Sequence, residues 1–305
     1  MPRLSIVIPL LDDSARFEET LASVLRERPR HTQILVPHRG DYEDPYGLAE
    51  EVEFLPLASD CSIASLWNAA VQAAAAPTVQ MLAPGFLAVA GWADSALSYF
   101  AQADVAAVAP QVTEAGNRGG EAVCGVVLDN RGRRRTCIDP QLENGTYAPV
   151  FGTGFYRTEA LLECGGFDEK FEPIAEMDLA WRLRRAGWHT VAALHASLQV
   201  MDRIPLSPEG FALGRSVARF GHRRSRVGEN SAGIGSLVTA QLGIAWRPAA
   251  WACIAGVVYG NCESIWRRAE FPTPLSAEEP ATLSLAGRDP RSQISGEAVR
   301  YRKAG

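Results

Sequence analysis

The stretch LSIVIPLL, residues 4–11, is an unbroken apolar run rich in isoleucine and valine near the start of the chain. Strands buried on both faces of a parallel sheet have this pattern, whereas half-exposed strands alternate polar and apolar residues. The next segment, residues 14–28, repeats apolar residues at helical spacing, and Ser14 is its predicted N-cap. The chain therefore opens with a buried strand followed by a helix.

The same alternation continues through the first third of the chain. Further strands are predicted at residues 33–37, 52–57, 78–82 and 105–112, and further helices at 63–76 and 92–102. Strands that alternate with helices across short connections indicate an α/β fold. We therefore expect one doubly wound, mostly parallel sheet flanked by helices.

The second half of the chain has a different pattern. Residues 122–139 predict a hairpin that turns at 129–132, and residues 157–166 predict a short helix closed by glycine. An amphipathic helix is expected at 175–187 and a strand at 189–194. Residues 230–246 and 248–262 are uncharged, but each falls short of the ~20 apolar residues of a membrane-spanning helix. They predict packed helices, with a peripheral membrane contact as the less favoured alternative.

Composition excludes several classes of protein. The 305 residues carry a formal net charge of −5, which argues against a nucleic-acid binder. The arginine runs at 131–135 and 222–226 are read as solvated surface. The six cysteines form no CxxC pair and no zinc spacing, so we expect reduced thiols in a cytoplasmic protein. The opening apolar run meets Asp12 too soon for a signal peptide.

One acidic segment stands apart from the predicted sheet. The stretch GGFDEKFEPIAEMDLAWRLRRAGW, residues 165–188, brings five carboxylates together just before and within a predicted helix. Acids in the first turn of a helix are favoured by the helix dipole, so they need no catalytic role. They are also the residue type that accepts a proton from a hydroxyl. Both interpretations stay open at this point.

The order of motifs resembles a family 2 glycosyltransferase with the GT-A fold. The resemblance runs from about residue 4 to about residue 200. It rests on LSIVIPLLD, LASVL, WNAAVQAAAAPTVQML, FGTGFYRTEALLECGGFDEKF and EMDLAWRLRRAGW. The resemblance implies a glycosyltransferase domain over residues 1–205. A helical extension is expected over 206–270, and the Pro-, Ser- and charge-rich composition of residues 271–305 predicts a weakly ordered tail.

The resemblance implies a donor site at the carboxyl ends of the strands, where doubly wound sheets hold ligands. The positions that match it for nucleotide-sugar binding are Pro9, Asp12, His38, Asn68, Ala83 and Gly85. The family's Asp-x-Asp metal motif falls on Ala83, Pro84 and Gly85, which offer no side-chain oxygen to a hard cation. The family's further histidine ligand falls near Val200, and His195 arrives too early. We therefore expect no protein-bound metal cofactor.

On the acceptor side the resemblance makes Glu176 the catalytic base that deprotonates the acceptor hydroxyl. The alternative is an acid placed only for the helix dipole. Supporting positions on this side are Asp168, Glu169, Asp178, Trp181 and Arg182. Their simpler interpretations are solvated acids, an Asp178–Arg182 pair one helical turn apart, and a core tryptophan.

Two functions remain open from the sequence. The first is transfer of a sugar, with inversion, from a nucleotide-sugar donor to a hydroxyl of a glycan or lipid acceptor. The second is a pseudo-glycosyltransferase that keeps the fold as a binding or scaffold module. The arginine run at 222–226 or His38 can supply the positive charge for metal-independent transfer. The missing Asp-x-Asp motif favours the second function, and Glu176 with Asp178 favours the first.

Overall fold

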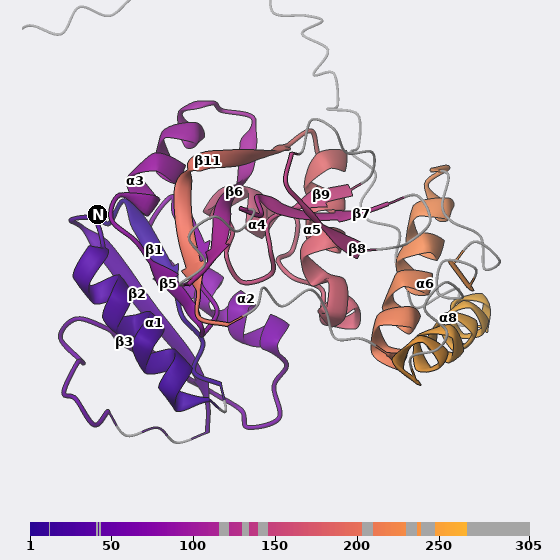
Figure 1. Cartoon of the computed structure of the whole chain (residues 1–305), viewed down its shortest axis with the longest axis horizontal. Helices are drawn as coiled ribbons and strands as arrows, with labels where there is room; N and C mark the ends of the chain where they lie inside the picture. Colours follow the sequence, from indigo (N-terminus) through magenta and orange to yellow (C-terminus); the bar gives the residue numbers. More distant parts are fainter. Residues whose placement is uncertain are drawn as a thin grey trace, which may run out of the picture. The chain divides into compact units, whose positions relative to one another are not determined.

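The computed structural model describes residues 1–11, 13–40, 42, 44–115, 122–129, 134–139, 146–202, 210–229, 237–238 and 248–266 (Figure 1). The chain divides into two compact units, Met1–Thr273 and Pro274–Gly305, and the description concerns the first. The expected tail lies outside the described residues. The expected domain boundary near residue 205 also falls on such residues and stays a prediction.

An eight-stranded sheet forms the centre of the first unit. Its order is β3-β2-β1-β4-β10-β6-β11-β5. The bounds are β3 Glu53–Leu57, β2 Thr32–Arg39, β1 Leu4–Val7, β4 Thr78–Met81, β10 Phe155–Arg157, β6 Val105–Glu114, β11 His189–Val200 and β5 Phe86–Ala88. All run in one direction except β10 and β5, which are antiparallel to their neighbours. The prediction that the first five apolar runs share one mostly parallel sheet is confirmed.

The strand order reverses at β1. From β1 the chain adds β2 and then β3 on one side, and it returns to place β4 on the other side. Ile6 pairs with Ile34 of β2 and with Gln80 of β4. The carboxyl ends of β1 and β4 therefore form a topological switch point, which is where open α/β sheets hold ligands.

Helices cover both faces of this sheet. Ile6 of β1 belongs to one apolar core together with Phe17 of α1 (Ser14–Glu27). The adjacent Val7 belongs to a second core together with Trp67 of α2 (Ile63–Ala73). Successive residues of a strand point to opposite faces, so the unbroken apolar run feeds both cores. The remaining helices along the sheet are α3 Trp92–Leu97, a 3-10 turn Ser98–Ala101, α4 Thr158–Glu163, a 3-10 helix Glu169–Ile174 and α5 Ala175–Arg185.

Several element ends differ from the sequence predictions. The N-cap of α1 is Asp13, whose carboxylate accepts from the Arg16 amide (3.1 Å), and not Ser14. β1 ends at Val7, although the Leu10 amide still bonds the Pro37 carbonyl of β2 (3.0 Å). Pro9 lies between them and has no amide proton, which interrupts the ladder. β11 runs on to Val200 past an irregularity between Ala193 and Ser197.

A smaller sheet lies beside the large one in the order β8-β7-β9. Its strands are β7 Gly125–Leu128, β8 Arg134–Cys137 and β9 Thr146–Ala148. Leu128 pairs with Arg134 across the antiparallel β7–β8 pair, which confirms the predicted hairpin strands. Most of the predicted turn lies outside the described residues.

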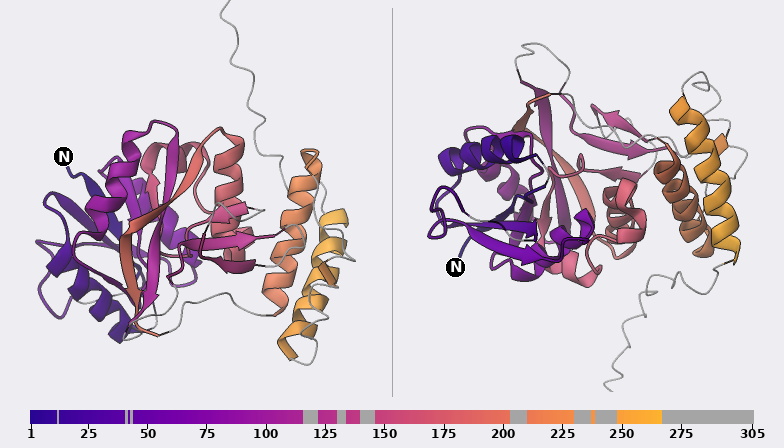
Figure 2. Two further views of the ribbon diagram at one scale, coloured as in Figure 1. Left: turned by 45° about the horizontal axis from the view of Figure 1, so that its top comes forward. Right: turned by 90° about the horizontal axis from the view of Figure 1, so that it is seen from below.

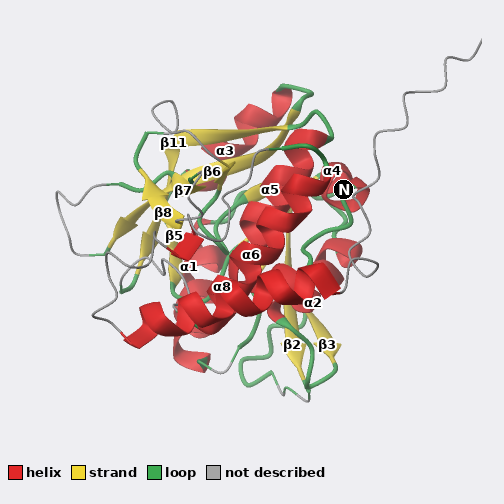
Figure 3. Cartoon of the chain, turned by 90° about the vertical axis from the view of Figure 1, so that its right-hand side faces the viewer, coloured by secondary structure: helices red, strands yellow, loops and turns green. Residues whose placement is uncertain are grey.

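Two long helices follow the large sheet in the sequence. They are α6 Phe211–Arg226 and α8 Pro248–Trp266, which lie side by side in both views of Figure 2. Of the predicted helical segment 230–246, only residues 237–238 are described. Figure 3 looks onto α6 and α8, with α5 beside them. Among the described residues, none of the helices has the length and apolar character that a membrane span requires.

Candidate functional site

The segment that follows β4 lies at the switch point. The Ala83 amide donates to the Gly152 carbonyl (2.7 Å), and the Met201 amide donates to the Gly85 carbonyl (2.9 Å). Gly152 has φ +73°, and a Cβ there would clash with the Cβ of Ala83. The ends of β4 and β11 therefore meet here, and small residues allow the close approach.

The segment Ala83–Gly85 does not fit a divalent cation. The Gly85 amide is bound to Thr20 Oγ1 (2.9 Å), and no residue of the three carries a side-chain oxygen. Among the described residues no group of three His, Cys, Asp or Glu side chains can hold a metal ion. Hard cations need several clustered oxygen ligands, so we derive no step through a protein-bound metal.

A charged side chain lies directly beside this segment. A Cβ on Gly85 would come within 3.6 Å of Arg16 Cδ. The Arg16 guanidinium contacts Asp202 Oδ2 through Nη2 (2.5 Å) and Asp13 Oδ2 through Nε (3.1 Å). Half of the Arg16 side chain is exposed, so its ion pairs are solvated and weak, and another anion can replace the two carboxylates.

The end of β2 supplies an aromatic group. His38 is buried, and its ring lies near those of Tyr42 (centroids 5.6 Å apart) and Phe54 (6.4 Å). His38 Nδ1 has no hydrogen-bond partner among the described residues. Pro9 is buried, and Asp12 lies outside the described residues. His38 belongs to the buried strand β2 and not to a loop.

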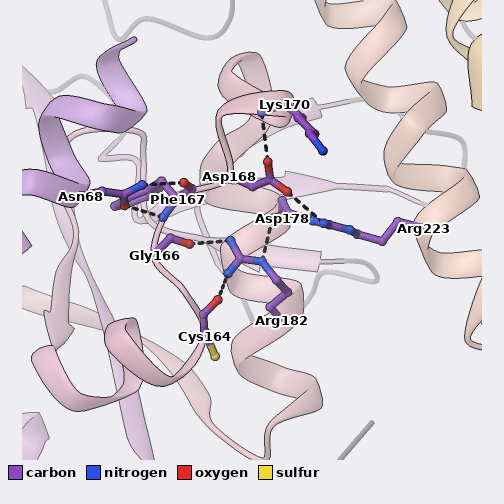
Figure 4. Close-up of polar contacts among 9 residues, drawn as sticks. All are labelled: Asn68, Cys164, Gly166, Phe167, Asp168, Lys170, Asp178, Arg182 and Arg223. Atoms are coloured by element: carbon purple, nitrogen blue, oxygen red, sulfur yellow. Dashed lines mark hydrogen bonds and ion pairs between the residues drawn. The ribbon is translucent and has the colours of Figure 1, made fainter. Parts of the chain in front are cut away.

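The side-chain amide of Asn68, in α2, hydrogen-bonds the backbone of another segment. Its Nδ2 donates to the Phe167 carbonyl (2.8 Å), and its Oδ1 accepts from the Phe167 amide (2.8 Å). Gly166, with φ +69°, leaves room for this pair, since a Cβ there would clash with Asn68 Oδ1. Asn68 therefore fixes the loop that begins the acidic segment (Figure 4).

Glu176 lies in the first turn of α5 and pairs with an arginine of the small sheet. Its Oε1 accepts from Nε and Nη2 of Arg134, each at 2.7 Å. The two side chains are 1% and 3% exposed. Glu176 Oε2 is also buried and has no hydrogen-bond partner among the described residues. The nearby Tyr156 is buried, and burial together with the charge of Glu176 raises the pKa of its hydroxyl.

Asp178 and Asp168 share an arginine that comes from α6. Arg223 contacts Asp178 Oδ1 (2.5 Å) and Asp168 Oδ2 (2.9 Å). Arg182 contacts Asp178 Oδ2 (2.8 Å), which confirms the predicted pair one turn apart. In Figure 4 the two arginines approach Asp178 from different sides. Burial alone would lower the pKa of Arg223, but its two carboxylate partners raise it.

The remaining acids of the segment face α2. Glu169 Oε1 accepts from Ser65 Oγ (2.7 Å), and Glu172 Oε1 accepts from the Ile63 amide (2.8 Å) at the start of that helix. A carboxylate at a helix N-terminus complements the helix dipole. Trp181 is fully buried and donates from Nε1 to Glu229 (2.9 Å), so it is a core residue. Every carboxylate of the acidic segment is thus bound within the chain.

The interpretation of the two arginine runs as solvated surface is wrong at their key positions. Arg134 is buried against Glu176, and Arg223 and Arg224 are mostly buried against carboxylates. Arg134 and Arg223 neutralise carboxylates of the acidic segment, but they lie 42 to 55 residues away from them in the sequence. Arg16 and Asp202 were also missed, because neither belongs to a motif. The signal that could have found Arg16 is the strand–helix order, because a helix that follows a strand begins near the carboxyl end of that strand.

No protein-family model matches the chain, and no curated protein matches it by sequence. Solved structures share its fold at 12% identity. GalNAc-T7 with UDP, GalNAc and Mn²⁺ matches with a TM-score of 0.56 over 72% of this chain and 48% of that one. Residues 1–349 of TarS from S. aureus match at 0.53, over 88% and 73%. The mannosyltransferase PcManGT from Pyrobaculum calidifontis, with GDP-Man and Mn²⁺, matches at 0.54 over 88% of each chain.

These likenesses show the fold. The chain has a GT-A-like glycosyltransferase fold, with a mostly parallel central sheet flanked by helices. It spans about half the length of the GalNAc-T7 chain and most of the PcManGT chain.

Proposed function

We propose that this chain transfers a sugar from a nucleotide-sugar donor to an acceptor hydroxyl with inversion. The observation that carries the proposal is the GT-A-like sheet with its reversal at β1, which brings the ends of β1, β2 and β4 together. The end of β11 joins them through the hydrogen bond from the Met201 amide to the Gly85 carbonyl. PcManGT, of similar fold, is a mannosyltransferase solved with GDP-Man and Mn²⁺. Sheets of this type hold ligands at the switch point.

The donor would lie along the strand ends. His38, with an unpartnered buried Nδ1 among the described residues, would hydrogen-bond the nucleobase beside Tyr42. Pro9, Asp12, Ala83 and Gly85 would border the sugar and diphosphate, while Asn68 would act only through the loop that it fixes.

The diphosphate would bind without a metal held by the segment 83–85. Among the described residues, Arg16 is a cation next to Gly85. Its ion pairs with Asp13 and Asp202 are exposed, so phosphate oxygens can replace these carboxylates as its partners. A guanidinium suits this exchange because its fork matches phosphate geometry and it stays charged. It would offset the negative charge that develops on the leaving diphosphate.

In the transfer step Glu176 would be the base. The acceptor oxygen gives its proton to Glu176 Oε2 and forms a bond to the anomeric carbon. The bond between that carbon and the diphosphate breaks on the opposite face, and configuration inverts. Arg134 would hold Oε1 and orient the carboxylate. Because Glu176 is 1% exposed, the acceptor can reach it only if a neighbouring segment of the same chain moves away.

A second candidate is a nucleotide-sugar-binding module without transfer. The specific observation in its favour is that all five carboxylates of the acidic segment are bound internally, Glu176 in a buried ion pair. Such pairs serve stability and orientation equally well. The two candidates share the donor site and differ in turnover.

The test is donor turnover by the purified full chain, with EDTA and with added Mn²⁺. We expect EDTA-insensitive turnover that Glu176→Gln abolishes, and a loss of donor affinity in Arg16→Met. Arg26→Met, an exposed arginine on the same helix, is the matched control. Donor binding without turnover would support the second candidate, and turnover abolished by EDTA would refute the metal-free site.

A further inference from the structure

Helix α8 is almost free of charge. Glu263 is the one residue of its 19 that is charged at neutral pH, and its side chain faces α6. There it binds Arg215 (2.7 Å) and Arg219 (2.5 Å). Gly256 and Gly260 allow close packing, since a Cβ on either would collide with the backbone of α6. The inner face of α8 is therefore covered by α6.

The outer face of α8 is apolar along its whole length. The exposed positions are Trp251, Ala255, Val258, Tyr259, Cys262, Ile265 and Trp266. At 100° per residue they fall in an arc of about 120°. Trp251 is 58% exposed and Trp266 is 91% exposed, at opposite ends of the helix. A helix that is apolar all round is normally covered on every side.

This face concentrates the exposed apolar side chains of the described chain. Twelve large hydrophobic residues are exposed among the described positions, and five of them lie on α8. A sixth, Phe211 of α6, lies beside Tyr259 with the rings tilted and their centroids 5.5 Å apart. Scattered exposed hydrophobics need no explanation, but a contiguous patch marks an interaction surface.

We propose that this face of α8 binds the surface of an anionic lipid bilayer, with the helix lying in the membrane plane. Tryptophans at both ends suit the interface between headgroups and acyl chains. In the sequence Arg247 directly precedes the helix, and Arg267 and Arg268 directly follow it. In-plane helices combine an apolar face with basic residues in this way.

A second copy of the chain is the alternative occupant of this face, and the vesicle experiment distinguishes it from a bilayer. An inserted helix face gains by apolar burial and by attraction of its basic flanks to the headgroups. The inference is independent of donor turnover.

Vesicle flotation of the full chain tests the proposal, with phosphatidylcholine vesicles and vesicles that also contain phosphatidylglycerol. We expect flotation with the anionic vesicles and a blue-shifted tryptophan emission. The double variant Val258→Glu/Ile265→Glu should bind about tenfold more weakly or worse, since two charges enter the apolar layer. Leu162→Glu, an exposed leucine on α4, is the control and should float as the wild type does.

Circular dichroism establishes that the variants fold. If the double variant does not, Ala255→Glu decides, because this exposed small residue on the same arc has little packing to lose. Three results would overturn the proposal. They are no flotation with either vesicle, flotation unchanged in the glutamate variants, and a wild-type dimer that the variants convert to monomer without any vesicle binding.

Discussion

Glu176 and Arg134 form a buried ion pair between the first turn of α5 and strand β8. The Arg134 Nη2 to Glu176 Oε1 distance is 2.7 Å, and the side chains are almost inaccessible to water. The candidate base is thereby held by the small sheet, which a hairpin contributes from outside the acidic segment. In the proposed transfer step, catalysis and stability would depend on the same contact.

Replacing Arg134 by methionine should destabilise the chain by about 3–5 kcal/mol, because it leaves a buried carboxylate without its cation. The double variant Arg134→Met/Glu176→Met should recover most of that loss, since no unpaired charge remains. Urea unfolding of the three proteins measures both effects.

Arg135→Met is the matched control on the same strand, at an exposed position. It should change the free energy of unfolding by about 0.5 kcal/mol or less. An Arg134→Met protein as stable as the wild type would show that the pair does not form in solution.

The central sheet could be predicted because its signal is local. Unbroken apolar runs such as residues 4–11 identify strands buried on both faces. β10 and β5 were missed because each has three residues, too few for any periodicity. β10 nevertheless lies between β4 and β6, so a short segment completes the sheet.

The candidate site was harder to predict than the sheet. The acids of the segment 165–188 were identified, but their partners come from α2, β8 and α6, all distant in sequence. Charge type alone cannot tell a solvated arginine from one that enters a buried pair. The run containing Arg134 shows this, because Arg135, its neighbour on the strand, is exposed.

Two adjacent glycines offer a matched test of the loop that Asn68 fixes. Gly166→Ala should be strongly destabilising, by about 3 kcal/mol, because it combines a positive φ with a clash against Asn68 Oδ1. Gly165→Ala has a similar φ but open space around the new Cβ, so only about 1 kcal/mol is expected. Thermal unfolding compares them, and equal losses would argue against the Asn68 contact.

The contact between α6 and α8 should weaken in acid. Hydrogen bonds from Arg215 and Arg219 lower the pKa of Glu263 to about 2 from an ordinary 4.5. A carboxylate with a depressed pKa stabilises the fold fully above its unfolded pKa, and this stabilisation is lost as the pH falls toward 2.

The difference in unfolding free energy between wild type and Glu263→Gln should therefore be largest near pH 7 and shrink between about pH 4.5 and pH 2. Urea unfolding at pH 7 and pH 3 measures it. Glu159→Gln, an exposed acid on α4, is the control and should show little difference at either pH. A Glu263→Gln difference that does not change with pH would mean that the ion pair adds no stability.

His38 should contribute to nucleotide affinity. Replacing it by phenylalanine keeps the aromatic packing with Tyr42 and Phe54 but removes the buried Nδ1. We expect about tenfold weaker nucleotide binding, the cost of one lost hydrogen bond. His195→Phe, on an exposed position of β11, is the control. Unchanged affinity in His38→Phe would exclude His38 from the donor site.

The most direct test of the account is calorimetric titration of the full chain with UDP and GDP, in EDTA and again with added Mn²⁺. The donor site proposed at the switch point has no metal ligands in the segment 83–85 and has Arg16 beside it. We predict weak binding of one nucleoside diphosphate whose Kd is the same within about twofold with and without manganese. Binding that requires Mn²⁺, or no binding of either nucleotide, would contradict the account.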